Sequence, residues 1–177
     1  MIAVVGGKTY TMTGTPVEKG VVLIEDGKIL DVGRDLEIPT DCQIIDATGK
    51  FVFPGFIDAH SHIGIFEEVI GEIGEDGNEW TDPITPHLRA IDAVNPRDKA
   101  FDDAVKGGVT CVFTGPGSAN VIGGQSIAMK TYGHIIDNMV VKAPAGLKVA
   151  FGENPKRVYG EQKKMPSTRM GAAGLLR

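Results

Sequence analysis

Short β-prone runs separated by turn residues organise the first fifty positions of the chain. Residues 21–25 and 28–32 lie on either side of Asp26-Gly27. This dipeptide supplies the positive φ angles that a tight hairpin requires. The pattern predicts a small antiparallel sheet over residues 1–50, with a domain boundary before Phe51.

The next apolar run begins near Phe51 and ends in His60-Ser61-His62. Pro54-Gly55 makes a sharp turn into it, and Phe56 and Ile57 predict that the strand is buried. Successive side chains of a strand point to opposite faces, so His60 and His62 share a face and can converge on one ion. Neutral imidazole is the commonest metal ligand at physiological pH. The context favours a metal site over a chance His-x-His at a solvated strand end.

A helix and another strand follow. Asn95-Pro96 suits an N-cap and first helical residue, an apolar stripe at helical spacing comes next, and Gly107-Gly108 ends the pattern. We expect a helix over residues 96–106. Residues 109–113 form a continuous β-branched and aromatic run, typical of a strand buried on both faces of a parallel sheet. Strand, helix and strand together predict a βαβ unit.

Three later segments have the composition of strands. Residues 127–132 and 139–143 are the arms of an expected hairpin, and its loop holds His134. Residues 147–151 form another apolar run and predict a separate buried strand. We expect His134 and His87 on the surface and not as metal ligands.

Length and composition fit one ordinary globular domain. Hydrophobic residues make up 42% of the 177 positions, which is enough for a core. The formal net charge is −5 and no block of Lys or Arg occurs, so we expect no nucleic-acid partner. No segment approaches the roughly 18 uninterrupted apolar residues of a membrane span. The start of the chain also lacks the positive flank of a signal peptide. We expect a cytoplasmic protein with no membrane partner.

Two further features are assigned no chemistry. Cys42 and Cys111 lie in apolar settings and are expected to be buried free thiols. Residues 64–82 contain many carboxylates and no lysine or arginine. Such a segment can attract cations or a basic substrate, but a solvated loop is the expected role.

The run from Pro54 to His62, Pro-Gly-Phe-Ile-Asp-Ala-His-Ser-His, resembles the first-strand signature of the amidohydrolase superfamily. The flanking sequence is most similar to the imidazolonepropionase-related branch. The resemblance covers the N-terminal portion of such an enzyme and implies an α/β fold, an incomplete (β/α)8 TIM barrel. On this basis residues 51–177 are the first few βα units of a truncated barrel. Residues 1–50 are the N-terminal half of a small composite β-sandwich.

The resemblance also implies ligands beyond the two histidines. In relatives, a glutamate or a carboxylated lysine from a later barrel strand completes or bridges the metal centre. Glu153, at the exit of the predicted strand 147–151, is our candidate third ligand. Lys156 is the competitor, and a structural role for both is the alternative. Further histidines and a proton-shuttling aspartate are expected beyond Arg177, so no catalytic residue is assigned.

The glycine-rich residues 115–126 do not match a nucleotide-binding loop. A dinucleotide fingerprint needs glycine where Asn120 stands, and a P-loop needs lysine where Gln125 stands. A loop after a barrel strand fits better, because small residues and backbone N–H groups can approach a substrate there. Asn120 and Gln125 are candidate substrate contacts, and the alternative for both is hydrogen bonding that stabilises the loop.

The function implied by the resemblance is metal-dependent hydrolysis of a C–N bond in a cyclic amide or peptide-like small molecule. One or two divalent ions would activate water, and zinc is the leading candidate. Asp58 shares a face with His60 and is a candidate partner that orients its ring; a hydrogen bond within the barrel floor is the alternative. Two other functions stay open: a noncatalytic fragment that binds metal weakly or self-assembles, and a nucleotide-binding α/β domain.

The end of the chain suggests truncation. Residues 166–177 begin like a capped helix and stop without a C-terminal signal. We expect the isolated chain to be inactive. Its open sheet edges are expected to make it a homo-oligomer, or to bind the missing C-terminal portion.

Overall fold

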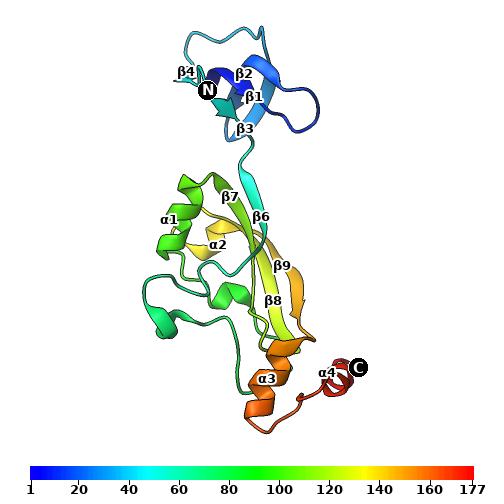
Figure 1. Cartoon of the computed structure of the whole chain (residues 1–177). Helices are drawn as coiled ribbons and strands as arrows, with labels where there is room; N and C mark the ends of the chain where they lie inside the picture. The colour runs from blue at the N-terminus through cyan, green and yellow to red at the C-terminus, as the bar shows by residue number, and fades with distance from the viewer. The chain divides into compact units, whose positions relative to one another are not determined.

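The computed structural model describes all 177 residues and divides them into two compact units, Met1–Pro54 and Gly55–Arg177 (Figure 1). Each unit has its own sheet. The sequence placed the boundary before Phe51. In the structure, strand β5 (Phe51–Val52) pairs with β1 (Ile2–Thr9), so the first unit extends to Pro54.

The first unit is a mixed five-stranded sheet. Its other strands are β2 (Val17–Glu25), β3 (Lys28–Gly33) and β4 (Gln43–Asp46). The order is β3-β2-β1-β4, and β5 continues beside β1. Strands β1 to β3 are antiparallel as expected, but β4 and β5 run parallel to β1. The expectation of a wholly antiparallel sheet was therefore wrong. The connection over residues 34–42 lets the chain return in the direction of β1 before β4, and β5 follows β4 in the same direction after residues 47–50.

The hairpin predicted at Asp26-Gly27 is confirmed. Glu25 faces Lys28 across the turn, and the φ angles of Asp26 and Gly27 are 49° and 73°. Two successive positive φ angles are those of the type I′ turn, whose twist matches the twist of the two strands.

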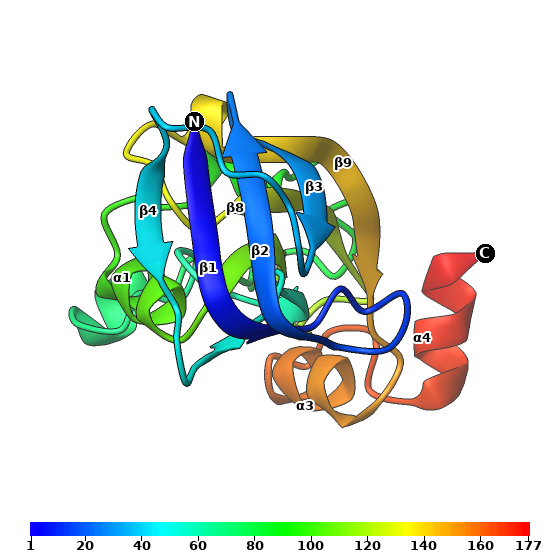
Figure 2. The same cartoon turned by 90° about the horizontal axis from the view of Figure 1, so that it is seen from above.

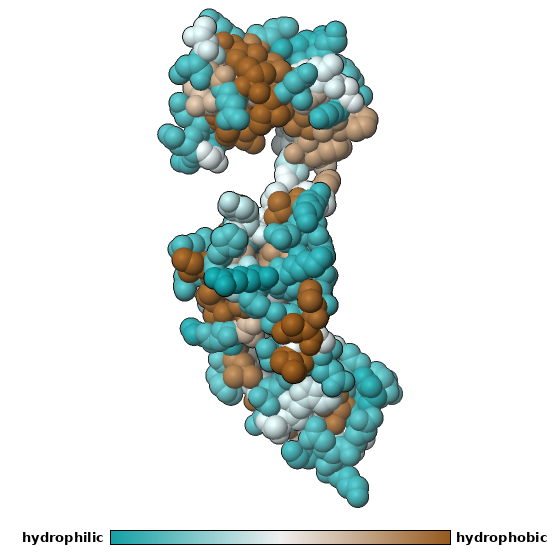
Figure 3. Space-filling model, turned by 90° about the vertical axis from the view of Figure 1, so that its left-hand side faces the viewer, coloured by the Kyte–Doolittle hydropathy of each residue, from teal (hydrophilic) through white to brown (hydrophobic).

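The sheet of the first unit is covered unevenly. Val21 and Val22 are 7% exposed, whereas Ile29 and Ile44 are 64% and 51% exposed. Figure 3 shows apolar side chains gathered on the outside of this unit. The unit thus presents apolar sheet surface to solvent, which a lone globular domain normally covers.

The second unit contains a four-stranded sheet in the order β6-β7-β8-β9. Its strands are β6 (Phe56–Ser61), β7 (Val109–Thr114), β8 (Ile122–Lys130) and β9 (Val140–Val149). Its helices are α1 (Lys99–Lys106), α2 (Ile136–Met139), α3 (Glu153–Glu161) and α4 (Arg169–Leu176), with short 3-10 helices at Gly71–Gly74 and Ala90–Asp92. One apolar core packs on this sheet, and its larger members are Ile65, Phe101, Val112, Ile127, Met129 and Met139.

The βαβ unit β6-α1-β7 is confirmed, because β6 and β7 are parallel and α1 connects them. The helix begins three residues later than expected. Asn95 accepts a hydrogen bond from the Arg97 amide and forms a turn, while the Asp98 side chain accepts from the Ala100 amide and caps α1. The helix ends at Gly107-Gly108 as predicted, with a φ of 82° at Gly108.

The expected hairpin after β7 is also present, with longer arms. Strands β8 and β9 are antiparallel, and β9 extends to Val149. Residues 147–149 therefore belong to β9 and are not the separate barrel strand that we expected. The short connection from Lys130 to Val140 explains the direction, since parallel neighbours need a crossover of a dozen or more residues. The second unit is α/β in class. That its sheet is part of an incomplete barrel stays a prediction.

Strand burial differs from the expectation. Phe56 and Ile57 are 55% and 72% exposed, because β6 is an edge strand with a neighbour on one side only. Leu147 on the other edge strand is 50% exposed. Strand β7 alternates, with Val112 and Thr114 buried and Thr110 exposed. Burial of Phe56, Ile57 and Leu147 was predicted and is not found, and neither is the burial on both faces predicted for residues 109–113.

Helices α3 and α4 close the chain and lie next to each other in two views (Figures 1 and 2). The capped helix expected here is confirmed as α4, where the Thr168 hydroxyl accepts from the Gly171 amide at 2.9 Å. No helix combines the length and the apolar content that a membrane span requires. Cys42 and Cys111 are free thiols as expected, but both are half-buried.

A buried polar cluster connects α3 with the loop before β8 and with residues 79–82. Tyr159 and Asn120 have no exposed surface. The Tyr159 hydroxyl lies 2.9 Å from the Glu79 carbonyl oxygen and 2.8 Å from that of Asp82. The Asn120 Nδ2 donates to the same two carbonyls at 2.6 and 2.8 Å, and to the Tyr159 Oη at 3.0 Å. Two side chains thus hold both ends of the segment 79–82.

We predict that Tyr159→Phe lowers the free energy of unfolding by about 1 kcal/mol, the typical worth of a buried hydrogen bond. The loss is moderate because Asn120 still donates to both carbonyls. Urea unfolding measures it. The matched control is Tyr132→Phe, since Tyr132 is 80% exposed. Equal stability of the two variants would contradict this role for the Tyr159 hydroxyl.

The same cluster predicts a loss of stability at alkaline pH. Burial, aided by the Asp82 and Glu79 carboxylates, raises the pKa of Tyr159 from 10.0 to about 12. The unfolded chain then ionises this phenol first, so the contribution is full below pH 10 and is lost as the pH approaches 12. Urea unfolding across this range should show a steeper fall for the wild type than for Tyr159→Phe. Parallel curves would refute the assignment.

Candidate metal centre

His60 and His62 lie at the end of β6 and face each other. His60 is on the strand, and His62 follows its last residue, Ser61. The two ring centroids are 5.5 Å apart, and the ring planes are nearly perpendicular at 88°. Alternation along a strand favours a common side for residues two apart, and the two rings do come together, although the pairing of β6 with β7 is irregular between Asp58 and Ser61.

The His62 ring is held by its surroundings. Its Nδ1 lies 2.7 Å from the carbonyl oxygen of Gly115, and its ring packs edge-on against Phe66 at 5.2 Å. A carbonyl accepts only, so a neutral His62 carries its proton on Nδ1 and keeps the Nε2 lone pair for a metal. A ring hydrogen bond of this kind orients metal-ligating histidines in general. The half-buried His62 ring is thus held with its Nε2 as the nitrogen left for a ligand role, which stays a prediction, whereas His60 is exposed.

A small hollow of about 30 Å³ lies beside the two histidines. It has room for about one water molecule or ion. Its other lining residues come from the ends of neighbouring strands and their loops: Ser61, Phe113, Gly115, Pro116, Ser126 and Lys148.

The sequence analysis missed Lys148. It is half-buried, whereas its neighbours Leu147 and Val149 on β9 are exposed. The available signal was a single lysine inside the apolar run 147–151. Because strand side chains alternate, such a lysine points to the face opposite its apolar neighbours. Here that face borders the histidine hollow.

The donor set fits part of a metal site. Two imidazoles with one oriented ring suit zinc or another borderline divalent ion. No group of three or more His, Cys, Asp or Glu side chains is close enough to hold an ion in this chain. The chain therefore brings together two candidate ligands and not a full coordination shell.

Glu153 and Lys156 are placed in α3 and pair with each other. Glu153 is the first residue of the helix, its side chain is 80% exposed, and its Oε2 lies 3.3 Å from the Lys156 Nζ. This ion pair matches the structural alternative. A ligand role for either residue stays a prediction.

Asp58 contacts the main chain of His60. Its Oδ1 accepts a hydrogen bond from the His60 amide at 3.0 Å. The carboxylate thus fixes the backbone at His60, and the structure records no bond between Asp58 and either imidazole. Its role as an orienting partner of the His60 ring stays a prediction.

Asn120 and Gln125 make the loop-stabilising contacts that we considered as their alternative role. Asn120 is fully buried and bonds the carbonyls of Glu79 and Asp82. Gln125 is half-buried on β8, and its Nε2 donates to the Pro86 carbonyl at 3.1 Å. Contact of either side chain with a substrate stays a prediction. His87 and His134 are exposed, as expected.

Asp98 anchors the segment that leaves His62, and the sequence analysis did not single it out. The side chain is 5% exposed. Its Oδ2 accepts from the Gly64 amide at 3.3 Å, and its Oδ1 accepts from the Glu68 amide at 3.4 Å. The same carboxylate caps α1. An aspartate just before a helical stripe is a typical N-cap signal and could have revealed it.

The structure is similar to the crystal structure of an amidohydrolase from Thermotoga maritima MSB8, with a TM-score of 0.95 and 53% sequence identity. The match covers 99% of this chain and 45% of that chain. An amidohydrolase of Hapsidospora irregularis is 37% identical over 166 residues, which are 86% of this chain and 17% of that protein.

Two shorter matches carry more specific names. A dihydroorotase of Anaeromyxobacter dehalogenans is 29% identical over 116 residues, covering 66% of this chain and 22% of that protein. An imidazolonepropionase of Geobacillus sp. is 45% identical over 53 residues, covering 26% and 12%. No family model matches the chain. The chain spans less than half the length of each of these relatives.

Proposed function

We propose that this chain, which belongs to the amidohydrolase superfamily, supplies the first metal ligands of a hydrolase that cleaves C–N bonds. The observation that carries the proposal is the facing pair His60 and His62 at the end of β6, with the His62 ring fixed by Gly115. The names of the relatives support hydrolysis of an amide, and dihydroorotase supports a cyclic one.

In this proposal His60 and His62 hold a divalent ion as part of a site with one or two ions. Zinc is the leading candidate for that ion. A bound ion of this kind lowers the pKa of a water ligand toward about 7 and polarises the amide carbonyl. His62 presents its Nε2 because its Nδ1–H donates a hydrogen bond to the Gly115 carbonyl. Asp58 fixes the main chain at His60. The remaining ligands come from outside this pair, with Glu153 the first candidate and Lys156 the second.

No residue of this chain is assigned the general acid–base role. Proton transfer to the leaving nitrogen needs a group within hydrogen-bond reach of that atom. The polar side chains beside the two histidines are Ser61, Ser126 and Lys148, and none of them is the aspartate that the family resemblance implies. The proposal therefore assigns metal binding and substrate placement to this chain. It assigns the proton transfer to residues of the complete enzyme.

The second candidate function is a noncatalytic polypeptide that binds metal weakly or self-assembles. Two observations favour it: only two ligands gather, and β6 is an exposed edge strand. We extend the proposal to association with another copy or with the rest of a barrel, because open strand edges favour pairing. For the hydrolase of the first proposal we also propose a cytoplasmic location and a small amide substrate, with the isolated chain inactive.

We predict that His60→Ala and His62→Ala each lower zinc affinity by at least about tenfold, since losing even an indirect partner of a ligand commonly costs about 10–100-fold. Equilibrium dialysis of the 177-residue chain against zinc measures the affinity. His87→Ala and His134→Ala are matched controls, because both side chains are exposed and far in sequence from the motif. Unchanged zinc affinity in both motif variants would refute the site.

The activity test uses a polypeptide as long as the relatives. With zinc bound, it should hydrolyse a cyclic amide such as a dihydropyrimidine or hydantoin, and His60→Ala should abolish turnover. Hydrolysis that survives in His60→Ala would contradict the mechanism. Zinc binding without hydrolysis of any cyclic or acyclic amide would favour the noncatalytic alternative.

A further inference from the structure

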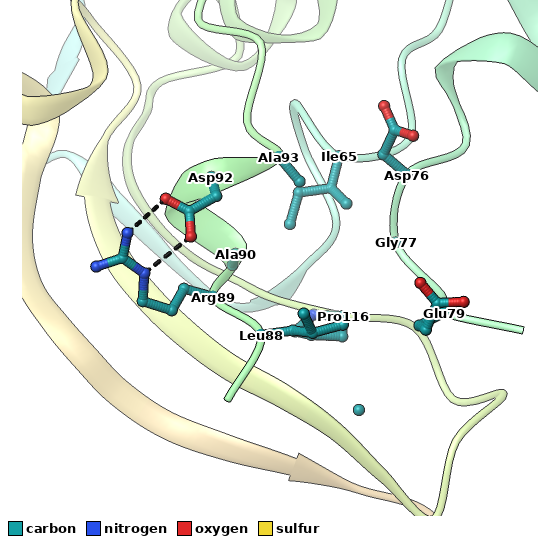
Figure 4. Close-up of a pocket in the computed structure, with 11 residues that line it drawn as sticks. Ile65, Asp76, Gly77, Glu79, Leu88, Arg89, Ala90, Asp92, Ala93 and Pro116 are labelled. Atoms are coloured by element: carbon teal, nitrogen blue, oxygen red, sulfur yellow. Dashed lines mark hydrogen bonds and ion pairs between the residues drawn. The ribbon is translucent and has the colours of Figure 1, made fainter. Parts of the chain in front are cut away.

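A larger cavity of about 440 Å³ adjoins the histidine hollow, and Pro116 lines both. Its volume lies within the range of about 300–1,000 Å³ that is usual for small-molecule sites. Figure 4 shows its apolar part, where Ile65, Leu88, Ala90 and Ala93 lie between two groups of charged side chains. An apolar stem of a ligand can therefore be covered here while a charged end reaches a wall.

Arg89 and Asp92, on one side of the cavity, neutralise each other. The Arg89 Nε lies 2.8 Å from Asp92 Oδ2, and its Nη2 lies 2.7 Å from Asp92 Oδ1. This two-point contact raises the pKa of Arg89 and lowers that of Asp92, so both stay ionised. Because the guanidinium fork is engaged by Asp92, it is not free to clamp a ligand carboxylate in the same way.

The opposite wall keeps its negative charge. Asp76 and Glu79 lie on that side, on either side of Gly77 and Asn78. Glu79 Oε1 accepts from the Thr81 amide and hydroxyl at 3.1 and 2.6 Å, which lowers the pKa of this carboxyl. No lysine or arginine occurs from Gly64 to Leu88 to neutralise them. Neither Asp76 nor Glu79 takes part in an ion pair, so the cavity carries two exposed carboxylates without a paired cation.

Hydrogen bonds to the main chain fix the position of the segment that carries Asp76 and Glu79. The Glu79 carbonyl oxygen is bonded by the buried Tyr159 and Asn120, and the Gly77 carbonyl accepts from the Gly117 amide at 2.8 Å. The carboxylates therefore stand on an anchored segment and not on a free loop, which favours recognition of a ligand over general attraction of cations.

We propose that this cavity binds the cationic end, a guanidinium or ammonium on a short aliphatic stem, of the substrate whose amide lies at the histidine pair. The inference rests on the proposed function for its link to hydrolysis, but the binding step itself needs no metal. Asp76 and Glu79 are the specificity-determining residues, and the apolar residues between the walls cover the stem.

The test compares two ligands of nearly equal shape and different charge, butylguanidinium and butylurea, on the full 177-residue chain. Zinc is first removed with a chelator, and dissociation constants are measured by ligand-observed NMR. We expect butylguanidinium to bind about fivefold more tightly, which is the scale of two solvent-screened charge pairs. In the double variant Asp76→Asn, Glu79→Gln the ratio should fall to about one.

Glu75→Gln is the matched control, because Glu75 adjoins Asp76 and carries the same charge but does not line the cavity. It should keep the wild-type ratio. Equal binding of the two ligands, no binding of either, or an unchanged ratio in the double variant would overturn the inference, and so would tighter binding of pentanoate. The ligand-binding test is done without zinc and does not involve the His60 or His62 variants. A negative result in it therefore does not contradict the proposed metal site.

Discussion

The parallel pairing of β6 with β7 is the contact on which the histidine site depends. In its register Ser61 faces Thr114, so the next residues, His62 and Gly115, meet where the two strands end. The hydrogen bond that orients His62 follows directly from this pairing. Pro116 comes immediately afterwards and lines both the histidine hollow and the larger cavity. A shift of one residue in this register would turn the histidines to the other face of the sheet.

Features that depend on neighbouring residues could be predicted from the sequence. The turn at Asp26-Gly27 needs only two residues with positive φ, and the histidine pair needs only the alternation of a strand. Features that depend on distant partners could not be predicted in this way. Residues 147–149 have the composition of a buried barrel strand, but the short connection after β8 makes them the outer arm of a hairpin. Burial was overestimated for Phe56 and Ile57, because local composition does not say whether a strand lies at a sheet edge.

The candidate site shows the same division. His60 and His62 are neighbours in sequence, so their convergence could be predicted. Lys148 reaches the same hollow only through the pairing of β9 with β8 and of β8 with β7. Glu153 follows the strand region as expected, but the chain turns into α3 at that residue and the carboxylate pairs within the helix. Which further group joins the histidines depends on tertiary contacts that no local pattern encodes.

The anchoring of segment 79–82 has a consequence for how such a protein can change. Tyr159 and Asn120 recognise the carbonyl oxygens of Glu79 and Asp82, which every residue type possesses. Side chains at these positions can therefore be exchanged while the main-chain contacts with Tyr159 and Asn120 are kept. A wall anchored through its carbonyl oxygens keeps its place independently of residue type at these two contacts, so the charge that it presents can change while the anchor to Tyr159 and Asn120 persists.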